Sequence, residues 1–116
     1  MFLKEVSVMN AVSINTNDLK WQAAEGYSSG AEEKVLSVGG SVAPRTILLK
    51  IPPGWSMKAH SHVFTELHYV LEGSYESQGK TFKAGTYSII PKEVKHGDFA
   101  TKTGAIILIT WCTLKD

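Results

Sequence analysis

Short apolar runs separated by turn residues fill the chain from residue 33 onward. They are too short for helices and rich in β-branched and aromatic residues, so they favour strands. Their bounds are 34–38, 46–51, 57–62, 66–72, 74–77, 81–83, 86–90 and 105–111, with glycine or proline between most of them. Strands this short, with turns this frequent, predict an antiparallel barrel or sandwich rather than an α/β sheet.

The pattern also predicts a hairpin, an apolar last strand and a weakly patterned N-terminal segment. Residues 74–77 and 80–83 flank Gln78-Gly79, which predicts a tight hairpin, and both strands are polar enough for an outer edge. The last strand is apolar on both faces, so one face should meet the interior and the other a second layer or a second subunit. Before residue 33 the pattern is weaker: residues 6–14 are a candidate strand and residues 25–31 a loop without a motif.

The strongest chemical signal lies in residues 54–73. His60 and His62 are two positions apart, so they project from the same side of a strand and their imidazoles can converge on one ion. A zinc-binding helix would need ligands three or four positions apart, and the prolines just upstream also disfavour a helix. Glu66 follows by an even step at the start of the next strand, and His96 supplies another imidazole later in the chain.

These residues resemble the two sequence motifs of the cupin family. The first motif is a glycine, five residues, H-x-H, three or four residues, a glutamate, six residues and a glycine. It is matched in full by Gly54, His60, His62, Glu66 and Gly73.

The second cupin motif, near the end of the chain, is matched in part. Gly85, Pro91 and His96 agree with it, while Glu93 and Ala100 replace its second glycine and its asparagine. The resemblance implies an all-β fold, a double-stranded β-helix or jelly-roll barrel. We expect one domain over residues 1–116, with a strand or loop arm at 1–32 and the barrel core at 33–116.

The resemblance also implies one divalent transition metal per chain, held by His60, His62, Glu66 and His96. Three imidazoles and a carboxylate, without thiolates, suit Fe, Zn, Ni, Mn, Co or Cu and argue against a closed structural zinc site. An octahedral ion would keep two positions for water or substrate, as a catalyst needs. The alternative for Glu66 is a carboxylate that supports the ligands without touching the metal.

His68 is the candidate catalytic residue. It shares a strand face with Glu66, so it should point inward, where it could orient a substrate, shuttle a proton or substitute as a ligand. A hydrogen-bonded core histidine is the alternative. Further residues could line the cavity or only pack in the core: Trp55, Met57, Phe64, Tyr87 and Phe99.

Composition narrows the class of protein. A chain of 116 residues that is 43% hydrophobic and 20% charged fits one globular domain, and its net charge of +1 gives no basic surface for nucleic acid or anionic membrane. Cys112 is the single cysteine and is expected to be buried on the last strand. We find neither a signal peptide nor a membrane span, so we expect a cytoplasmic protein and, because cupins are commonly dimeric, a homodimer.

The cupin motif specifies a metal cage rather than a reaction, so two functions stay open. In the first, the chain is a small metalloenzyme, an iron(II)-type dioxygenase or a metal-assisted isomerase, acting on a small oxygen-rich substrate. In the second, it is a metal-dependent module that binds or senses a small molecule without turnover.

The relatives that this sequence resembles do not choose between these functions. It looks like single-domain cupins related to acetylacetone-cleaving dioxygenases and like the cupin domains of zinc-binding anti-sigma factors. We see no helical segment with the histidines and cysteines that would grip a sigma factor, so we expect sigma-factor regulation to be disfavoured.

Overall fold

The computed structural model describes residues 10–58, 64–92 and 98–112, and over these residues the chain is built from strands with no α-helix. A single 3-10 turn, η1, covers Thr16–Asp18. The strands are β1 (Gln22–Ala23), β2 (Glu32–Val38), β3 (Arg45–Ile51), β4 (Ser56–Met57), β5 (Thr65–Ser77), β6 (Lys80–Lys83), β7 (Tyr87–Ile90), β8 (Phe99–Ala100) and β9 (Ala105–Cys112).

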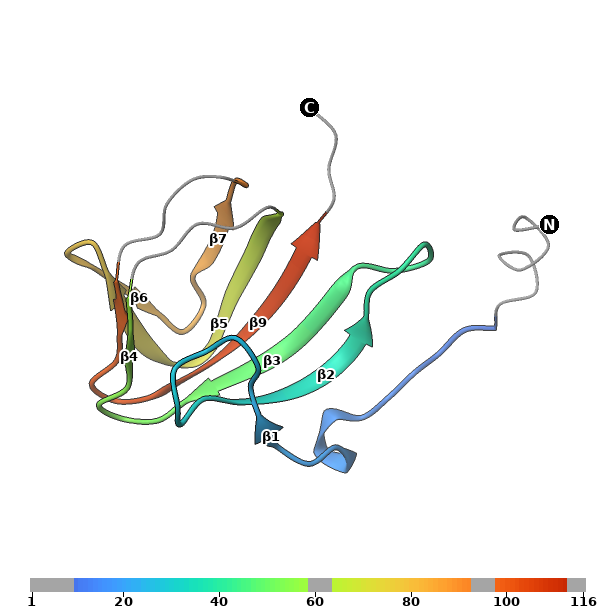
Figure 1. Cartoon of the computed structure of the whole chain (residues 1–116), viewed down its shortest axis with the longest axis horizontal. Helices are drawn as coiled ribbons and strands as arrows, with labels where there is room; N and C mark the ends of the chain where they lie inside the picture. Colours follow the sequence, from blue (N-terminus) through green and yellow to red (C-terminus); the bar gives the residue numbers. More distant parts are fainter. Residues whose placement is uncertain (1–9, 59–63, 93–97, 113–116) are drawn as a thin grey trace.

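The strands form one strongly curled antiparallel sheet (Figure 1). The order is β1-β2-β3-β9-β5-β8-β4, and β6 and β7 also pair with β5. In Figure 1, β2, β3, β9 and β5 make one wall, and β4, β6 and β8 turn back to face it across a common interior. This is the jelly-roll architecture that the sequence predicts.

Strand β5 joins the two walls. Its first half pairs with β7 and β9 and its second half with β6 and β8. The pairing with β9 shifts between Val70 and Glu72, and Gly73 follows with φ +70°. A Cβ at Gly73 would clash with the carbonyl oxygen of Gly104, so only glycine fits at this corner. The bulge and the glycine bend the strand from one wall into the other.

Strand register places the inward side chains in rows. One row contains Arg45, Trp111 and Glu66, and we call it the polar row. The next two rows are mainly aliphatic, and we call them the apolar rows: Ile47, Ile109 and His68, then Leu49, Ile107 and Val70.

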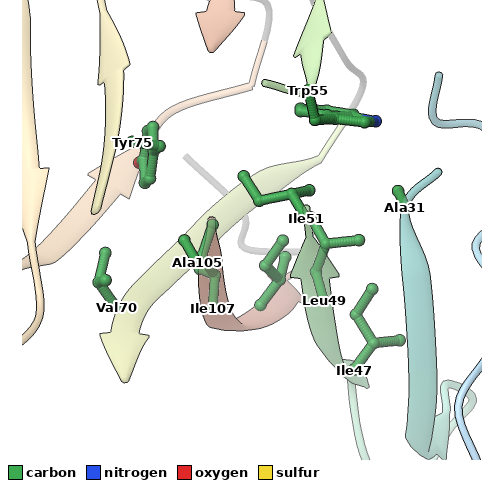
Figure 2. Close-up of a cluster of buried hydrophobic side chains, with 10 residues drawn as sticks. Ala31, Ile47, Leu49, Ile51, Trp55, Val70, Tyr75, Ala105 and Ile107 are labelled. Atoms are coloured by element: carbon green, nitrogen blue, oxygen red, sulfur yellow. The ribbon is translucent and has the colours of Figure 1, made fainter. Parts of the chain in front are cut away.

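The hydrophobic core occupies the part of the interior that the apolar rows line. Figure 2 shows aliphatic side chains from β3 and β9 that meet Val70 of β5 and two aromatic rings, Trp55 and Tyr75. Ile47, Ile109 and Val70 are at most 1% exposed. Burying a side chain of this size contributes about 1.5–3 kcal/mol, so the apolar rows hold the two walls together.

The outer face of the same wall is also apolar. Tyr69 pairs with Tyr87 on one side and with Leu108 on the other, and Leu67 pairs with Ile89. Tyr87 is 57% and Ile89 62% exposed. The last strand therefore has the two apolar faces expected from its sequence, one inside the barrel and one outside.

Several sequence-based bounds differ from the structure. Residues 66–72 and 74–77 form a single strand because Gly73 bends β5 without ending it. Residues 10–14 of the expected N-terminal strand are not in a strand, and the rest of that segment lies outside the described residues. The strand expected at 57–62 covers only Ser56–Met57 of the described residues.

The hairpin at Gln78-Gly79 was predicted correctly, but the polarity of its strands was misleading. Both residues have positive φ, 53° and 77°, as a two-residue hairpin turn requires. Tyr75, however, is only 2% exposed and packs on the rings of Phe82 and Phe99, so this part of β5 lines the interior rather than an outer edge. Cys112 is a free thiol and is half-buried rather than buried.

Candidate functional site

Glu66 is a buried carboxylate near the start of β5, with both of its oxygens engaged. Oε1 lies 2.7 Å from Nε2 of His68, and Oε2 accepts a hydrogen bond from Nε1 of Trp111 at 3.0 Å. The residue is 6% exposed. A carboxylate in such a position needs partners of this kind, because an isolated buried charge is costly. Each oxygen has two lone pairs, so both can still accept a further ligand.

His68 lies on the same face, one row deeper. Since the carboxylate accepts the hydrogen bond, Nε2 of His68 donates it. The hydroxyl of Tyr75 lies 3.5 Å from Nδ1, at the limit of hydrogen-bonding distance. The histidine is therefore held between a carboxylate and a phenol, with its ring orientation fixed.

A small cavity opens beside this pair. It measures about 20 Å³, room for one or two water molecules. Its lining is mainly apolar and comes from several strands and the loop before β2: Tyr27, Leu49, Ile51, Trp55, Glu66, His68, Tyr75, Phe99, Ile107 and Ile109. An apolar lining of this kind strengthens any electrostatic interaction made at Glu66.

The two tyrosines at the cavity stay protonated over a wide pH range. Burial raises the pKa of Tyr75 to about 12, and the negative charge of Glu66 adds to the effect. Burial also raises the pKa of Tyr27, helped by Glu66 and Glu33 and opposed by Arg45. Both phenols are therefore available as hydrogen-bond donors at neutral pH.

Three of the predicted metal ligands, His60, His62 and His96, lie outside the described residues. Of the four predicted ligands, the structure therefore describes only Glu66. Within residues 10–58, 64–92 and 98–112, no group of three or more His, Cys, Asp or Glu side chains could hold a metal ion.

The residues that flank the histidine-bearing segments 59–63 and 93–97 are neighbours at both ends. Met57 pairs with Phe99 where β4 meets β8. At the other end the backbone N–H of Lys92 donates to Oγ1 of Thr65 at 3.3 Å, and Glu66 pairs with Ile90. Both segments thus connect the same two regions, and one of those regions carries Glu66. A set of three imidazoles and this carboxylate fits a divalent transition metal.

The five candidates for cavity lining lie in different parts of the structure. Trp55 and Phe99 line the cavity beside Glu66, and Met57 packs against the core cluster. Phe64 lines a separate cavity nearer the mouth of the barrel. Tyr87 was a wrong candidate: its pairing with Tyr69 places it on the outer face.

Sequence reasoning missed Tyr27, Tyr75 and Trp111 as site residues. Trp111 could have been found, because it continues the inward alternation of Ile107 and Ile109 by another even step. Tyr27 gave no local signal, since it lies in a loop and reaches the cavity only through tertiary packing.

The curled antiparallel sheet has the cupin fold, and comparison with known sequences identifies the family. The chain belongs to the family of ChrR cupin-like domains, whose family model matches residues 9–114. The anti-sigma-E factor ChrR of Cereibacter sphaeroides is 32% identical over 85 residues. This match covers 73% of the chain but only 38% of that relative's length.

Solved structures agree with this assignment. The anti-sigma factor ChrR of Rhodobacter sphaeroides, in complex with SigE, matches with a TM-score of 0.68 at 27% identity, over 84% of this chain and 52% of that one. An acetylacetone dioxygenase from Acinetobacter johnsonii matches with a TM-score of 0.71 at 20% identity, over 90% of this chain and 74% of that one. The second likeness shows the shared fold alone.

The described residues contain strands and one short 3-10 turn. There, no helix has the length and apolar character needed to cross a bilayer. The cytoplasmic location stays a prediction, as does the division into an arm at 1–32 and a core at 33–116.

Proposed function

We propose that this cupin binds one divalent transition metal through His60, His62, Glu66 and His96 and acts as a small metal-dependent enzyme. The observation that carries the proposal is the buried Glu66–His68 pair, with Oε1 and Nε2 2.7 Å apart, facing a mainly apolar cavity beside the flanks of both histidine-bearing segments. The substrate class would be a small oxygen-rich molecule, and the reaction an iron(II)-type oxygenation or a metal-assisted isomerisation. Which of these two reactions the protein catalyses depends on the identity of the metal.

A bound divalent ion would supply Lewis acidity and, if it is iron(II), an electron for dioxygen. The chain's own residues have separate tasks. Glu66 carries the negative charge that offsets the ion, and His68 holds a proton at Nε2 beside it. Tyr75 and Tyr27 present neutral phenols to the cavity, while Trp55 and Phe99 contribute to its apolar lining.

The ligand assignment is tested by metal content. We expect His60→Ala, His62→Ala and His96→Ala each to lose stoichiometric metal while keeping the thermal stability of the metal-free protein, because the apolar rows do not depend on the ion. His68→Ala should keep the metal and change turnover. Full metal retention in any one of these three variants would rule out this ligand set.

The enzyme class is tested by elemental analysis of untagged protein, followed by oxygen uptake after anaerobic loading with iron(II). The substrate panel would contain β-diketones, phenols and keto acids. Substrate-dependent oxygen consumption that is lost in His68→Ala supports the dioxygenase. Metal binding without uptake or isomerisation for any compound would overturn the enzymatic proposal and leave the binding module.

The second candidate is a metal-dependent module that responds to a ligand without turnover. The specific support is the match to the ChrR cupin-like family and the relative that is an anti-sigma factor, of which this chain spans 38%. Such a module should change its surface or its oligomeric state when a ligand binds. For a binding module, hydrogen exchange measured with and without metal would reveal a change at the outer strands. For an enzyme, the change in hydrogen exchange would lie mainly around Glu66.

We also propose that two chains associate through the outer face of β5, β7 and β9. Tyr69, Tyr87 and Ile89 leave large apolar surfaces exposed there, and exposed apolar patches of this kind are typical of protein interfaces. Ile89→Glu should convert a dimer into a monomer in sedimentation analysis. A monomeric wild-type protein at micromolar concentration would contradict this association.

A further inference from the structure

A second and larger cavity lies at the mouth of the barrel. It measures about 400 Å³, within the usual range for small-molecule sites, whereas the cavity at Glu66 holds only water-sized molecules. The β2–β3 hairpin, the residue before β5 and the end of β9 form its lining: Val38, Gly39, Gly40, Pro44, Arg45, Phe64 and Trp111. Nothing in the proposed metal chemistry uses this cavity.

Arg45 is the charged residue among those lining side chains. Its guanidinium lies 5.4 Å from the centre of the Trp111 ring and 3.6 Å from Oε1 of Glu33. The side chain of Arg45 is 38% exposed, whereas that of Glu33 is 6% exposed. Among the described residues, no hydrogen-bond acceptor engages this guanidinium, and Oε1 of Glu33 also has no hydrogen-bond partner. Arg45 thus has N–H donors available toward the cavity.

Trp111 connects this cavity to the candidate metal site. It lies between Arg45 and Glu66 in the polar row, and its indole N–H donates to Oε2 of Glu66 while the residue lines the mouth cavity. Adjacent strands are about 4.8 Å apart, so the backbones of Arg45 and Glu66 are on the order of 10 Å apart across β9. A molecule the size of one ring can therefore touch Arg45 and still reach the neighbourhood of Glu66.

Resting on the proposed function, we propose that the mouth cavity is the substrate-binding site and that its occupant is a small planar carboxylate, with Arg45 as the anion receptor. The guanidinium offers a fork of parallel donors that matches a carboxylate, and the rings of Trp111 and Phe64 offer flat surfaces for a conjugated or aromatic body. Bound in this way, the carboxylate end is fixed at Arg45 and the rest of the molecule points along the polar row toward Glu66.

The charge of the mouth cavity favours a small planar carboxylate over other anions. One arginine lines the described part of the cavity, and it is already close to the negative Glu33. A single, partly offset positive charge suits a monoanion better than a phosphate dianion, which proteins bind with several donors or cations. A cationic ligand would be repelled by Arg45.

The probe is benzoate, with benzamide as its neutral isostere, titrated by calorimetry into metal-free and metal-loaded protein. Wild-type protein should bind benzoate in both forms and benzamide at least about tenfold more weakly. Arg45→Gln should weaken benzoate about 10- to 100-fold, the loss expected for a charge-assisted hydrogen-bond pair. Lys50→Gln is the matched control, because it removes a cation from the outer face of the same strand.

Arg45→Gln leaves Glu33 without its neighbouring charge, so folding must be checked by thermal unfolding. If it fails to fold, Arg45→Lys and the double variant Glu33→Gln/Arg45→Gln take its place. Lysine keeps the charge but not the fork, and should weaken benzoate about tenfold. The double variant removes the buried charge together with its partner and should lose benzoate as well.

The outcomes separate this proposal from the proposed metal function. Benzoate that binds metal-free protein and is lost in the Arg45 variants supports the site, whether or not the protein proves to bind metal. Benzoate that binds only the metal-loaded form, with the same affinity in Arg45→Gln, would place the anion on the metal. That result would overturn the Arg45 site and leave the metal assignment standing. No benzoate binding to either form would also overturn the site.

Discussion

The polar row and the apolar rows occupy the same face of the same three strands, yet they differ in what they can do. Ile109 is 1% and Ile47 is below 1% exposed, and both are surrounded by other aliphatic groups. The polar row begins two residues further along these strands. There Trp111 donates a hydrogen bond to Glu66 and has a cation–π contact with Arg45, and Arg45 and Glu66 carry charge. Along the strand direction, the residues that stabilise the barrel are thus separate from those that can take part in chemistry. His68 lies at the boundary between the two sets.

This separation suggests how the fold can host a reactive site. A buried carboxylate and imidazole would destabilise a core that had to close around them, because unpaired polar groups are costly there. Here the pair lies beside the mouth of the barrel, with Trp111 and Tyr75 as partners, and the apolar row beyond His68, made of Leu49, Ile107 and Val70, is wholly aliphatic. Substitutions in the two regions should therefore have different consequences.

The largest effect on stability should come from the apolar rows. Ile109→Ala should lower the free energy of unfolding by about 2–5 kcal/mol, because it leaves a cavity in a fully packed site. Urea denaturation measures this directly. Ile89→Ala on the outer face, where the side chain is 62% exposed, should cost no more than about 0.5 kcal/mol in the monomer. Equal losses in the two variants would contradict the distinction between core and surface isoleucines.

A substitution in the polar row should act on metal instead. Glu66→Gln keeps an acceptor for Trp111 but removes the charge, so metal affinity should fall about 10- to 100-fold. Competition with a chromophoric chelator measures the affinity. Glu72→Gln, on an exposed part of the same strand, should leave it unchanged. If Glu66→Gln also leaves the affinity unchanged, Glu66 supports the ligands without touching the metal.

The free energy of unfolding at alkaline pH should depend on the buried phenols at the boundary between the polar row and the apolar rows. The pKa of Tyr75 is about 12 in the folded protein against about 10 in the unfolded chain, so below pH 10 both states keep the proton. Between pH 10 and pH 12 the unfolded state loses it first. This lowers the free energy of unfolding by up to about 1.4 kcal/mol for each pH unit.

Removing the Tyr75 hydroxyl tests that assignment. Tyr75→Phe should show a shallower fall of stability across the same pH window, measured by urea denaturation at several pH values. Tyr87→Phe is the control, because Tyr87 is 57% exposed on the outer face. Parallel pH profiles for wild type and Tyr75→Phe would show that Tyr75 titrates normally.

Much of the fold could be predicted from local patterns, because strand periodicity and turn chemistry are local properties. The pair Gln78-Gly79 between two short strands made the hairpin predictable, and the even spacing of Glu66 and His68 put both on one face. Gly73 was misleading for a physical reason. A glycine with positive φ can end a strand or bend it, and only the close approach of Gly104 decides between the two.

The candidate site was harder to predict than the fold. Strands of two residues, such as β1 and β8, are too short to show a hydrophobic period. Tyr27 reaches the cavity from a loop, and Arg45 and Glu33 meet only because β2 and β3 pair inside the barrel. Such contacts depend on tertiary structure, so no window of the sequence contains them.

The most direct test of the central claim, that the polar end of the barrel binds a metal, is anomalous diffraction from crystals of protein loaded with cobalt(II). We expect one strong anomalous peak per chain, about 2.0–2.2 Å from a carboxylate oxygen of Glu66 and at similar distances from imidazole nitrogens of His60, His62 and His96. No peak near Glu66, or a peak bound by a different set of residues, would contradict it.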